Sequence, residues 1–307
     1  SLPDPEIKKL KDFQKKVYNE VKTEMDKLGW EKNSAGETAD YYLYLNETKC
    51  PYCNTTVPLA PSFIISVKNK TIAELKYNPT NNNYDITVKN NVSDGEMSAA
   101  KNGTVQKGSL HCPRCNNQTS ISTIRGDKKD NDGKTVYGLR QWDITDIVAK
   151  TTDVFHERLY CIRWITKDGK KEYRTPTPED FKREQDVLNY VQSNLTDWQA
   201  KGYTPTDKII EGVETERLKK ERGWNYWHQL FNSRQLLLNA LFLEKIEKIA
   251  QTKEEKVIGM LMVNRISDYN SKLSSWMPRD ISAESKGGNT FVNQALNTMY
   301  NYPARTL

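Results

Sequence analysis

Four of the five cysteines belong to a five-residue pattern that occurs twice, as Cys-Pro-x-Cys-Asn at residues 50–54 and again at 112–116. Two residues between the cysteines let one tight turn aim both sulfurs at a single ion, and proline begins such a turn with φ already fixed. The final asparagine tolerates the positive φ that often follows the second cysteine. Two such turns supply the four thiolates of a tetrahedral Zn²⁺ site, so we predict zinc bound by Cys50, Cys53, Cys112 and Cys115.

The two pairs are separated by residues 54–111, a longer interval than the roughly 15 to 20 residues of common two-pair zinc sites. A β-rich insert between the pairs would explain the interval. The alternative is a pair of disulfides or unrelated thiols, but the two cysteines of one such turn seldom form a structural disulfide. A site closed by four thiolates has no open position for water, so its role is expected to be structural. His111 is expected to be a bystander and Cys161 a buried strand residue.

Hydrophobic spacing predicts the elements that position these cysteines. Apolar residues recur every three or four positions over 6–28, which predicts an amphipathic helix ended by Gly29. Short strands are expected at 41–45, 62–67, 71–77 and 84–88, with a loop over 90–108. A hairpin with an Asp-Gly turn is expected over 159–174, followed by a helix capped at Thr177 and ending near Val191. Irregular chain is expected over 195–213, and further helices at 233–246, 254–266 and 290–300.

These elements predict an α+β fold, in which a zinc ribbon with a β-rich insert is followed by a mainly helical C-terminal region. We divide the chain into an N-terminal amphipathic helix (1–40), the zinc ribbon with its insert (41–125), a β-hairpin and helix region (126–210) and a helical region (211–307). The principal boundary is expected in the irregular segment before residue 213.

Composition narrows the class of protein. The chain has 307 residues, of which 36% are hydrophobic, enough for one large or two modest cores, and its formal net charge is +6. This charge favours an acidic partner such as nucleic acid, although lysine and glutamate are interleaved and the signal is mild. No run of about 18 apolar residues is present, so no membrane association is expected. The N-terminus resembles neither a signal nor a transit peptide, and a reducing cytoplasm fits best.

Catalytic motifs are missing from the chain. It contains no glycine-rich nucleotide loop, no Walker-type lysine loop and no GxSxG elbow. The chain has three histidines, of which His156 and His228 are candidates for a catalytic base; a structural or surface role is the alternative for both.

The densest basic cluster directly precedes an aromatic segment. Lys219 and Arg222 lie in this cluster, and Trp224 and Trp227 follow it. Basic side chains beside exposed aromatic rings can hold phosphates and stack bases. Spacings of three and four residues are also typical of a core-facing stripe, so packing is the alternative for the aromatic residues. We predict Lys219, Arg222 and Arg234 as DNA contacts.

Several ordered motifs resemble the adenine-specific DNA methylases that contain a zinc ribbon. Besides the two cysteine turns, they include Val57-Pro58-Leu59, Gly103-Thr104-Val105, Ser233-Arg234-Gln235-Leu236-Leu237, Asp268-Tyr269-Asn270-Ser271 and Asn289-Thr290-Phe291. The likeness covers roughly residues 41–302. It implies a zinc ribbon, DNA as substrate and S-adenosylmethionine as methyl donor.

The chain departs from that family in one important respect. The resemblance implies a glycine-rich S-adenosylmethionine loop and an Asp/Asn-Pro-Pro-Tyr motif, and neither is present; Asn78-Pro79-Thr80 lacks the second proline and the aromatic residue. The expected function is therefore a zinc-ribbon DNA-recognition and scaffold component of an adenine-N6 DNA methyltransferase, with S-adenosylmethionine bound only in the enzyme completed by a catalytic partner chain. The alternatives are a non-enzymatic zinc-ribbon adaptor that binds nucleic acid and a purely structural protein–protein module.

Overall fold

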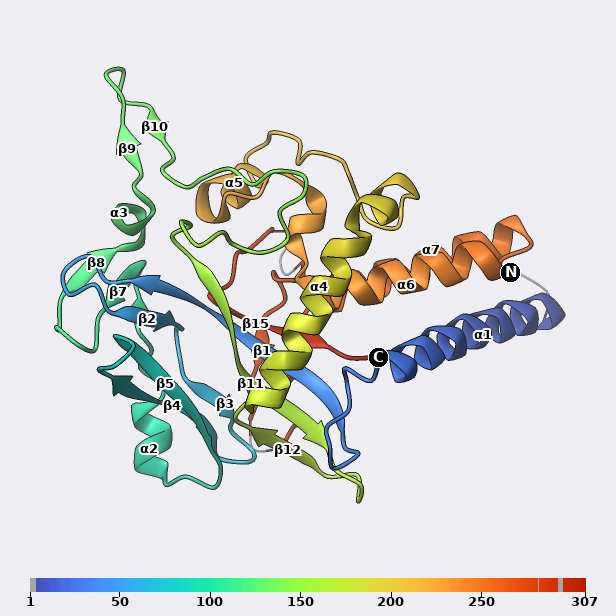
Figure 1. Ribbon diagram of the computed structural model, residues 1–307, viewed down its shortest axis with the longest axis horizontal. Coiled ribbons are helices and arrows are strands. Elements are labelled where there is room, and N and C mark those ends of the chain that lie inside the picture. The colour runs from blue at the N-terminus through green and yellow to red at the C-terminus, as the bar shows by residue number, and fades with distance from the viewer. Residues whose placement is uncertain (1–3, 281, 292–294) are drawn as a thin grey trace.

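A five-stranded antiparallel sheet lies at the centre of the molecule (Figure 1). The computed structural model describes residues 4–280, 282–291 and 295–307. Four strands follow the order β12-β11-β1-β15, and β2 pairs with the far end of β1. Their bounds are Thr38–Lys49 for β1, Thr56–Leu59 for β2, His156–Ile165 for β11, Lys171–Arg174 for β12 and Asn301–Arg305 for β15. The predicted strand at 41–45 lies within β1, and the predicted hairpin over 159–174 forms β11 and β12.

Smaller antiparallel sheets surround the central one. The insert between the cysteine pairs forms a three-stranded sheet from β3 (Ile64–Ser66), β4 (Thr71–Asn78) and β5 (Asn83–Lys89). A second three-stranded sheet contains β6 (Val105–Gln106), β7 (Ser109–His111) and β8 (Gln118–Ser120). Two short hairpins pair β9 (Lys128–Lys129) with β10 (Thr135–Val136), and β13 (Trp276–Met277) with β14 (Lys286–Gly287). The predicted β-rich insert is thus confirmed within a mixed helical and antiparallel fold.

Strand β1 is buried on both faces, which explains its nearly continuous apolar sequence. Tyr41, Leu43 and Leu45 pack against the insert, whereas Tyr42 and Tyr44 lie on the opposite face with Tyr302 of β15. On that second face the Tyr44 hydroxyl donates to Glu184 of helix α4 (Pro178–Ala200) at 2.7 Å. Alternation along one strand therefore holds the insert and the helical layer against the same sheet.

Three long helices form an arm that extends away from the sheets (Figure 1). They are α1 (Asp4–Leu28), α6 (Ser233–Ile249) and α7 (Lys253–Tyr269), and each contacts the other two. Helix α4 (Pro178–Ala200) also packs on α6, and its predicted Thr177 cap is confirmed by a capping box with Asp180. Val17 and Val21 of α1 are fully buried against this core, which confirms the predicted apolar stripe. None of the described helices is both long and apolar enough to cross a bilayer.

The remaining helices are short: α2 (Asp94–Ala99), α3 (Ile121–Arg125), α5 (Glu216–Arg222) and the 3₁₀ turn Trp227–Leu230. Helix α2 corrects the loop expected over 90–108. Gly95 and the polar neighbours suggested a loop, but a capping box between Ser93 and Glu96 starts a helix there.

Two further expectations were wrong. Helix α4 continues to Ala200 instead of becoming irregular at 195, because Leu195 and Trp198 continue its buried face. The helix expected over 290–300 is not formed in the described residues 290, 291 and 295–300, and residues 292–294 lie outside the description. The chain instead leads into β15, where Tyr302 and Ala304 are buried against β1.

Candidate metal centre

Each cysteine pair lies in the turn of a β-hairpin. Cys50 follows β1 and β2 begins soon after Cys53, while the second pair lies between β7 and β8. The two turns have the same backbone hydrogen bond, in which the amide of Asn54 or Asn116 donates to the carbonyl of the first cysteine at 2.9 Å. These asparagines have φ of 57° and 59°, which confirms the positive φ predicted at both positions. The sequence repeat is therefore a structural repeat.

The four sulfurs converge on one point. Cys50 Sγ lies 3.7 Å from Cys115 Sγ, and Cys53 Sγ lies 3.6 Å from Cys112 Sγ. All four ligand atoms lie within 4.8 Å of one another, and none of the five cysteines is in a disulfide. A tetrahedral ion with metal–sulfur bonds of about 2.3 Å requires sulfurs about 3.8 Å apart. The site can hold a metal ion, and the disulfide alternative is excluded in this structure.

The protein environment acts differently on the four thiols. Burial raises the pKa of Cys112 to about 12. Hydrogen bonds from Asn117, given by its side chain and its backbone, lower the pKa of Cys115 to about 6. Cys115 therefore favours the thiolate form, whereas Cys112 keeps its proton until a cation displaces it.

A third element supports the first turn, and no residue pattern in the sequence predicts that contact directly. Asn82 lies in the tight turn between β4 and β5, and its side-chain amide donates to the carbonyl of Asn54 at 3.0 Å. Its side-chain oxygen accepts from the Thr55 hydroxyl at 2.8 Å, and that hydroxyl lies 3.4 Å from Cys53 Sγ. The turn at 78–83 was recognisable from its asparagines, but its contact with the first cysteine turn, through Asn54 and Thr55, depends on how the insert folds back.

The predicted DNA-contact residues on α5 differ in accessibility. Lys219 is partly exposed, with its ammonium 3.6 Å from Glu211. Arg222 is only 8% exposed, and its guanidinium donates to the carbonyl oxygens of Glu221 and Met299. Trp224 is also buried, which favours the packing interpretation of that aromatic residue.

Arg234, at the start of α6, is 9% exposed. Its Nε donates to Glu184 at 2.7 Å, and its guanidinium lies 3.7 Å from the centre of the Tyr42 ring. Arg234 therefore joins α6 to α4 and β1 inside the molecule. The structure does not bring it to a common surface with Lys219.

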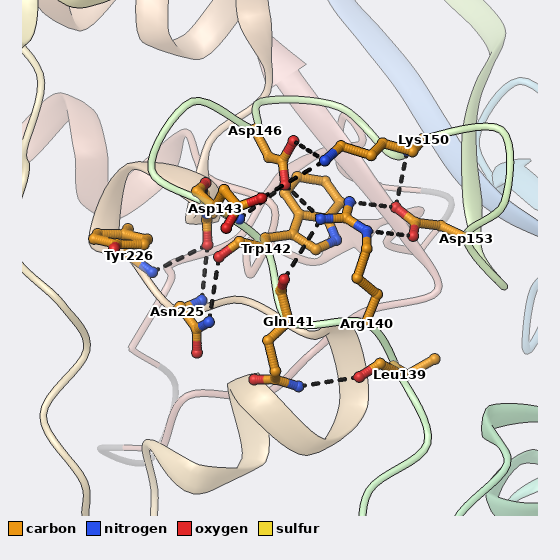
Figure 2. Close-up of polar contacts among 11 residues, drawn as sticks. Leu139, Arg140, Gln141, Trp142, Asp143, Asp146, Lys150, Asp153, Asn225 and Tyr226 are labelled. Atoms are coloured by element: carbon orange, nitrogen blue, oxygen red, sulfur yellow. Dashed lines mark hydrogen bonds and ion pairs between the residues drawn. The ribbon is translucent and has the colours of Figure 1, made fainter.

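A polar cluster in the segment 139–153 was not anticipated from the sequence (Figure 2). Arg140 donates two hydrogen bonds to Asp153, at 2.8 and 2.7 Å, and also pairs with Asp146. Burial acts to raise the pKa of Asp153, but the hydrogen bonds from Arg140 and from the Lys150 amide, together with the charge of Arg140, outweigh it and the pKa is lowered. Asn225 ties this segment to the chain after α5 by donating to the carbonyl of Trp142 at 3.2 Å. Since each charge has partners within the chain, we interpret the cluster as a structural support.

The cavity beside this cluster is too small for a nucleotide cofactor. It has a volume of about 30 Å³ and is lined by Arg140, Arg222, Trp142 and Trp224, among others. That volume accommodates one or two water molecules.

His228, one of the two histidines considered as a catalytic base, is fully buried, and burial lowers its pKa.

The cysteine cluster is therefore the part of the described chain in which side chains converge most clearly for binding. Compared with known proteins, the chain matches no family model, no curated protein and no solved structure.

Proposed function

We propose that this chain is the zinc-ribbon DNA-recognition and scaffold component of an S-adenosylmethionine-dependent adenine-N6 DNA methyltransferase, and that a partner chain supplies catalysis. The observation that carries the proposal is the cluster of four cysteines in two matching hairpin turns. Four thiolates in tetrahedral arrangement favour Zn²⁺ or an iron–sulfur centre, and paired turns of this kind favour structural zinc. The methyltransferase assignment rests on the ordered motifs in the sequence.

Zinc would be held by Cys50, Cys53, Cys112 and Cys115 and would join two hairpins that are distant in sequence. Such binding contributes on the order of 10 kcal/mol to the folding of small zinc domains. With four protein ligands, the ion would organise the structure and take no part in methyl transfer.

For DNA recognition we retain Lys219 and assign Arg222 and Arg234 to the interior of the protein. The tips of the cysteine turns offer a further surface, because Tyr52 is 65% exposed and Arg114 is exposed with its guanidinium 4.8 Å from the Tyr77 ring centre. An accessible tyrosine and arginine can contact a base and a phosphate.

The substitution Arg114→Ala should remove one phosphate contact. The slope of the logarithm of the duplex-binding constant against the logarithm of salt concentration should then fall in magnitude by about one. The matched substitution Lys256→Ala, on the distant arm, should leave it unchanged.

Native mass spectrometry of the chain purified from its own source tests the complete proposal. The expected complex contains one zinc and a second chain with the glycine-rich loop and the Asp/Asn-Pro-Pro-Tyr motif. That complex should transfer a labelled methyl group from S-adenosylmethionine to adenine in DNA. A complex with such a partner but without methyl transfer would contradict the proposal.

The second candidate is a non-enzymatic zinc-ribbon adaptor that binds nucleic acid. The observation favouring it is that this chain has neither of the two motifs that hold the methyl donor and the target amino group. The adaptor requires salt-dependent DNA binding by the zinc-loaded chain alone, with no methylation in any purified assembly.

A further inference from the structure

An apolar groove runs along the helical arm between α1 and α7, with α6 as its floor. It has a volume of about 640 Å³. Tyr18 of α1 lies on one side, Leu261 and Ile266 of α7 lie on the other, and Leu238 and Phe242 of α6 line the base. Three helices that the core already holds together thus form most of the groove, and Lys286 and residues 305–307 complete its lining.

The apolar surface continues along α7 beyond the groove. Val257 and Leu261 are 52% and 55% exposed, and they lie four residues apart on the same helix face as Arg265 and Tyr269. At 1.5 Å per residue, the stripe from 257 to 269 is about 18 Å long. This length equals three to four turns of a helix, which is longer than a small ligand requires.

The charged side chains that line the groove are all cationic. Among the described residues that line it, Arg265, Lys286 and Arg305 are cationic and none is aspartate or glutamate. Asp268, on the same helix, lies 3.6 Å from the Arg265 guanidinium. On α1, the exposed Lys11 and Lys15 share a helix face with Tyr18. The groove therefore combines an apolar centre with a cationic rim.

We propose that this groove docks an amphipathic helix with acidic flanks, contributed by a partner protein. Its apolar side chains, spaced three and four residues apart, would lie on Leu261, Ile266 and Phe242, in the manner of helix-in-groove recognition. Its carboxylates would meet Arg265, Lys286 and Arg305, which selects the partner by charge. The inference depends only on the groove and goes beyond the proposed methyltransferase role, so the two can fail separately.

The test uses the full chain and two fluorescent 18-residue peptides that share one leucine pattern at positions i, i+4, i+7 and i+11. One peptide carries glutamate at the flanking positions and the other carries lysine. Fluorescence anisotropy should show saturable binding of the glutamate peptide, at least tenfold tighter than the lysine peptide. Leu261→Asp should abolish this binding, and Arg265→Glu combined with Lys286→Glu should weaken it at least tenfold.

The matched control is Lys256→Glu, which reverses a charge on another face of α7 and should leave the affinity within twofold. Circular dichroism verifies that each variant keeps its helices, and the substituted side chains Leu261, Arg265 and Lys286 are exposed enough to tolerate the changes. Absence of binding, equal affinity for both peptides, or full binding by Leu261→Asp would overturn the inference. The inference would also be overturned if the unliganded chain sedimented as a dimer and Leu261→Asp converted it to a monomer. A second copy of the chain would then be the occupant of the groove.

Discussion

Each cysteine turn contains one residue whose backbone conformation most side chains avoid. Asn54 and Asn116 occupy the left-handed region that lets the chain leave the turn while both sulfurs stay aimed at the same point. The requirement is local, so residue type and spacing were sufficient to predict it. The support from Asn82 is not local, because it depends on the insert folding back over the first turn.

Replacing one ligand should remove the metal and loosen both hairpins. Cys112→Ser leaves three thiolates around a buried hydroxyl, so we expect zinc content measured by elemental mass spectrometry to fall from about one per chain to near zero. Limited proteolysis should then cut near residues 105–120. The matched Cys161→Ser, in buried strand β11, should lower stability but retain zinc. Full zinc content in Cys112→Ser would contradict the four-ligand site.

Zinc affinity should rise with pH. Because burial raises the pKa of Cys112 to about 12, the metal-free thiol is protonated at neutral pH and binding must release that proton. Each released proton makes the affinity about tenfold stronger per pH unit by mass action. Competition with a chromophoric chelator at pH 6, 7 and 8 measures this dependence. An affinity that stays constant over this range would show that the ion does not displace a proton.

The buried Arg234 should matter for stability and not for DNA binding. Arg234→Met leaves Glu184 without its guanidinium partner, and loss of one member of a buried pair costs about 3–5 kcal/mol. The comparison is Lys248→Met, which breaks an exposed pair with Glu244 on the same helix and should cost less than about 1 kcal/mol. Urea unfolding measures both. Loss of DNA affinity in a folded Arg234→Met protein would restore the original prediction of a DNA contact.

At the scale of elements, regular periodicity made the long helices predictable. The expected helix at 6–28 corresponds to α1, and the capped helix at Thr177 corresponds to α4. Strand β15 was missed because its stability comes from pairing with β1, about 260 residues earlier in the chain. Strand propensity depends on such neighbours, and a sequence window does not contain them. The short α2 was missed because its cap, and not its periodicity, defines it.

One glycine fixes how the insert returns to the second cysteine turn. A Cβ on Gly103 would lie 2.0 Å from the carbonyl oxygen of Ala60, a backbone atom that cannot rotate away. We expect Gly103→Ala to lower the free energy of unfolding by about 1–3 kcal/mol, as overpacking does. Gly95→Ala, within α2, meets only the Ser93 hydroxyl at 3.8 Å and should be neutral or stabilising. Equal denaturation midpoints for the two variants would exclude this close approach.

At the scale of the whole molecule, β1 connects three otherwise separate cores. Its odd-numbered residues, from Tyr41 to Leu45, belong to the insert core, and Tyr42 and Tyr44 belong to the core shared with β15. Cys50, immediately after the strand, belongs to the core around the metal site. The helical arm has its own larger core, which contains none of the four cysteines. The strand could be predicted from its residues, but the assignment of its two faces required the structure.

This separation of cores predicts a graded response to metal removal. A strong chelator should abolish amide-exchange protection in β7, β8 and the turn after Cys50, because their core is built around the sulfurs. Protection of α6, where Leu236, Leu237 and Leu241 are buried in the helical core, should persist. Hydrogen exchange followed by mass spectrometry resolves these segments, and Cys112→Ser without chelator should reproduce the same pattern. Simultaneous loss of protection in α6 would instead show that β1 transmits the metal-dependent folding to the whole chain.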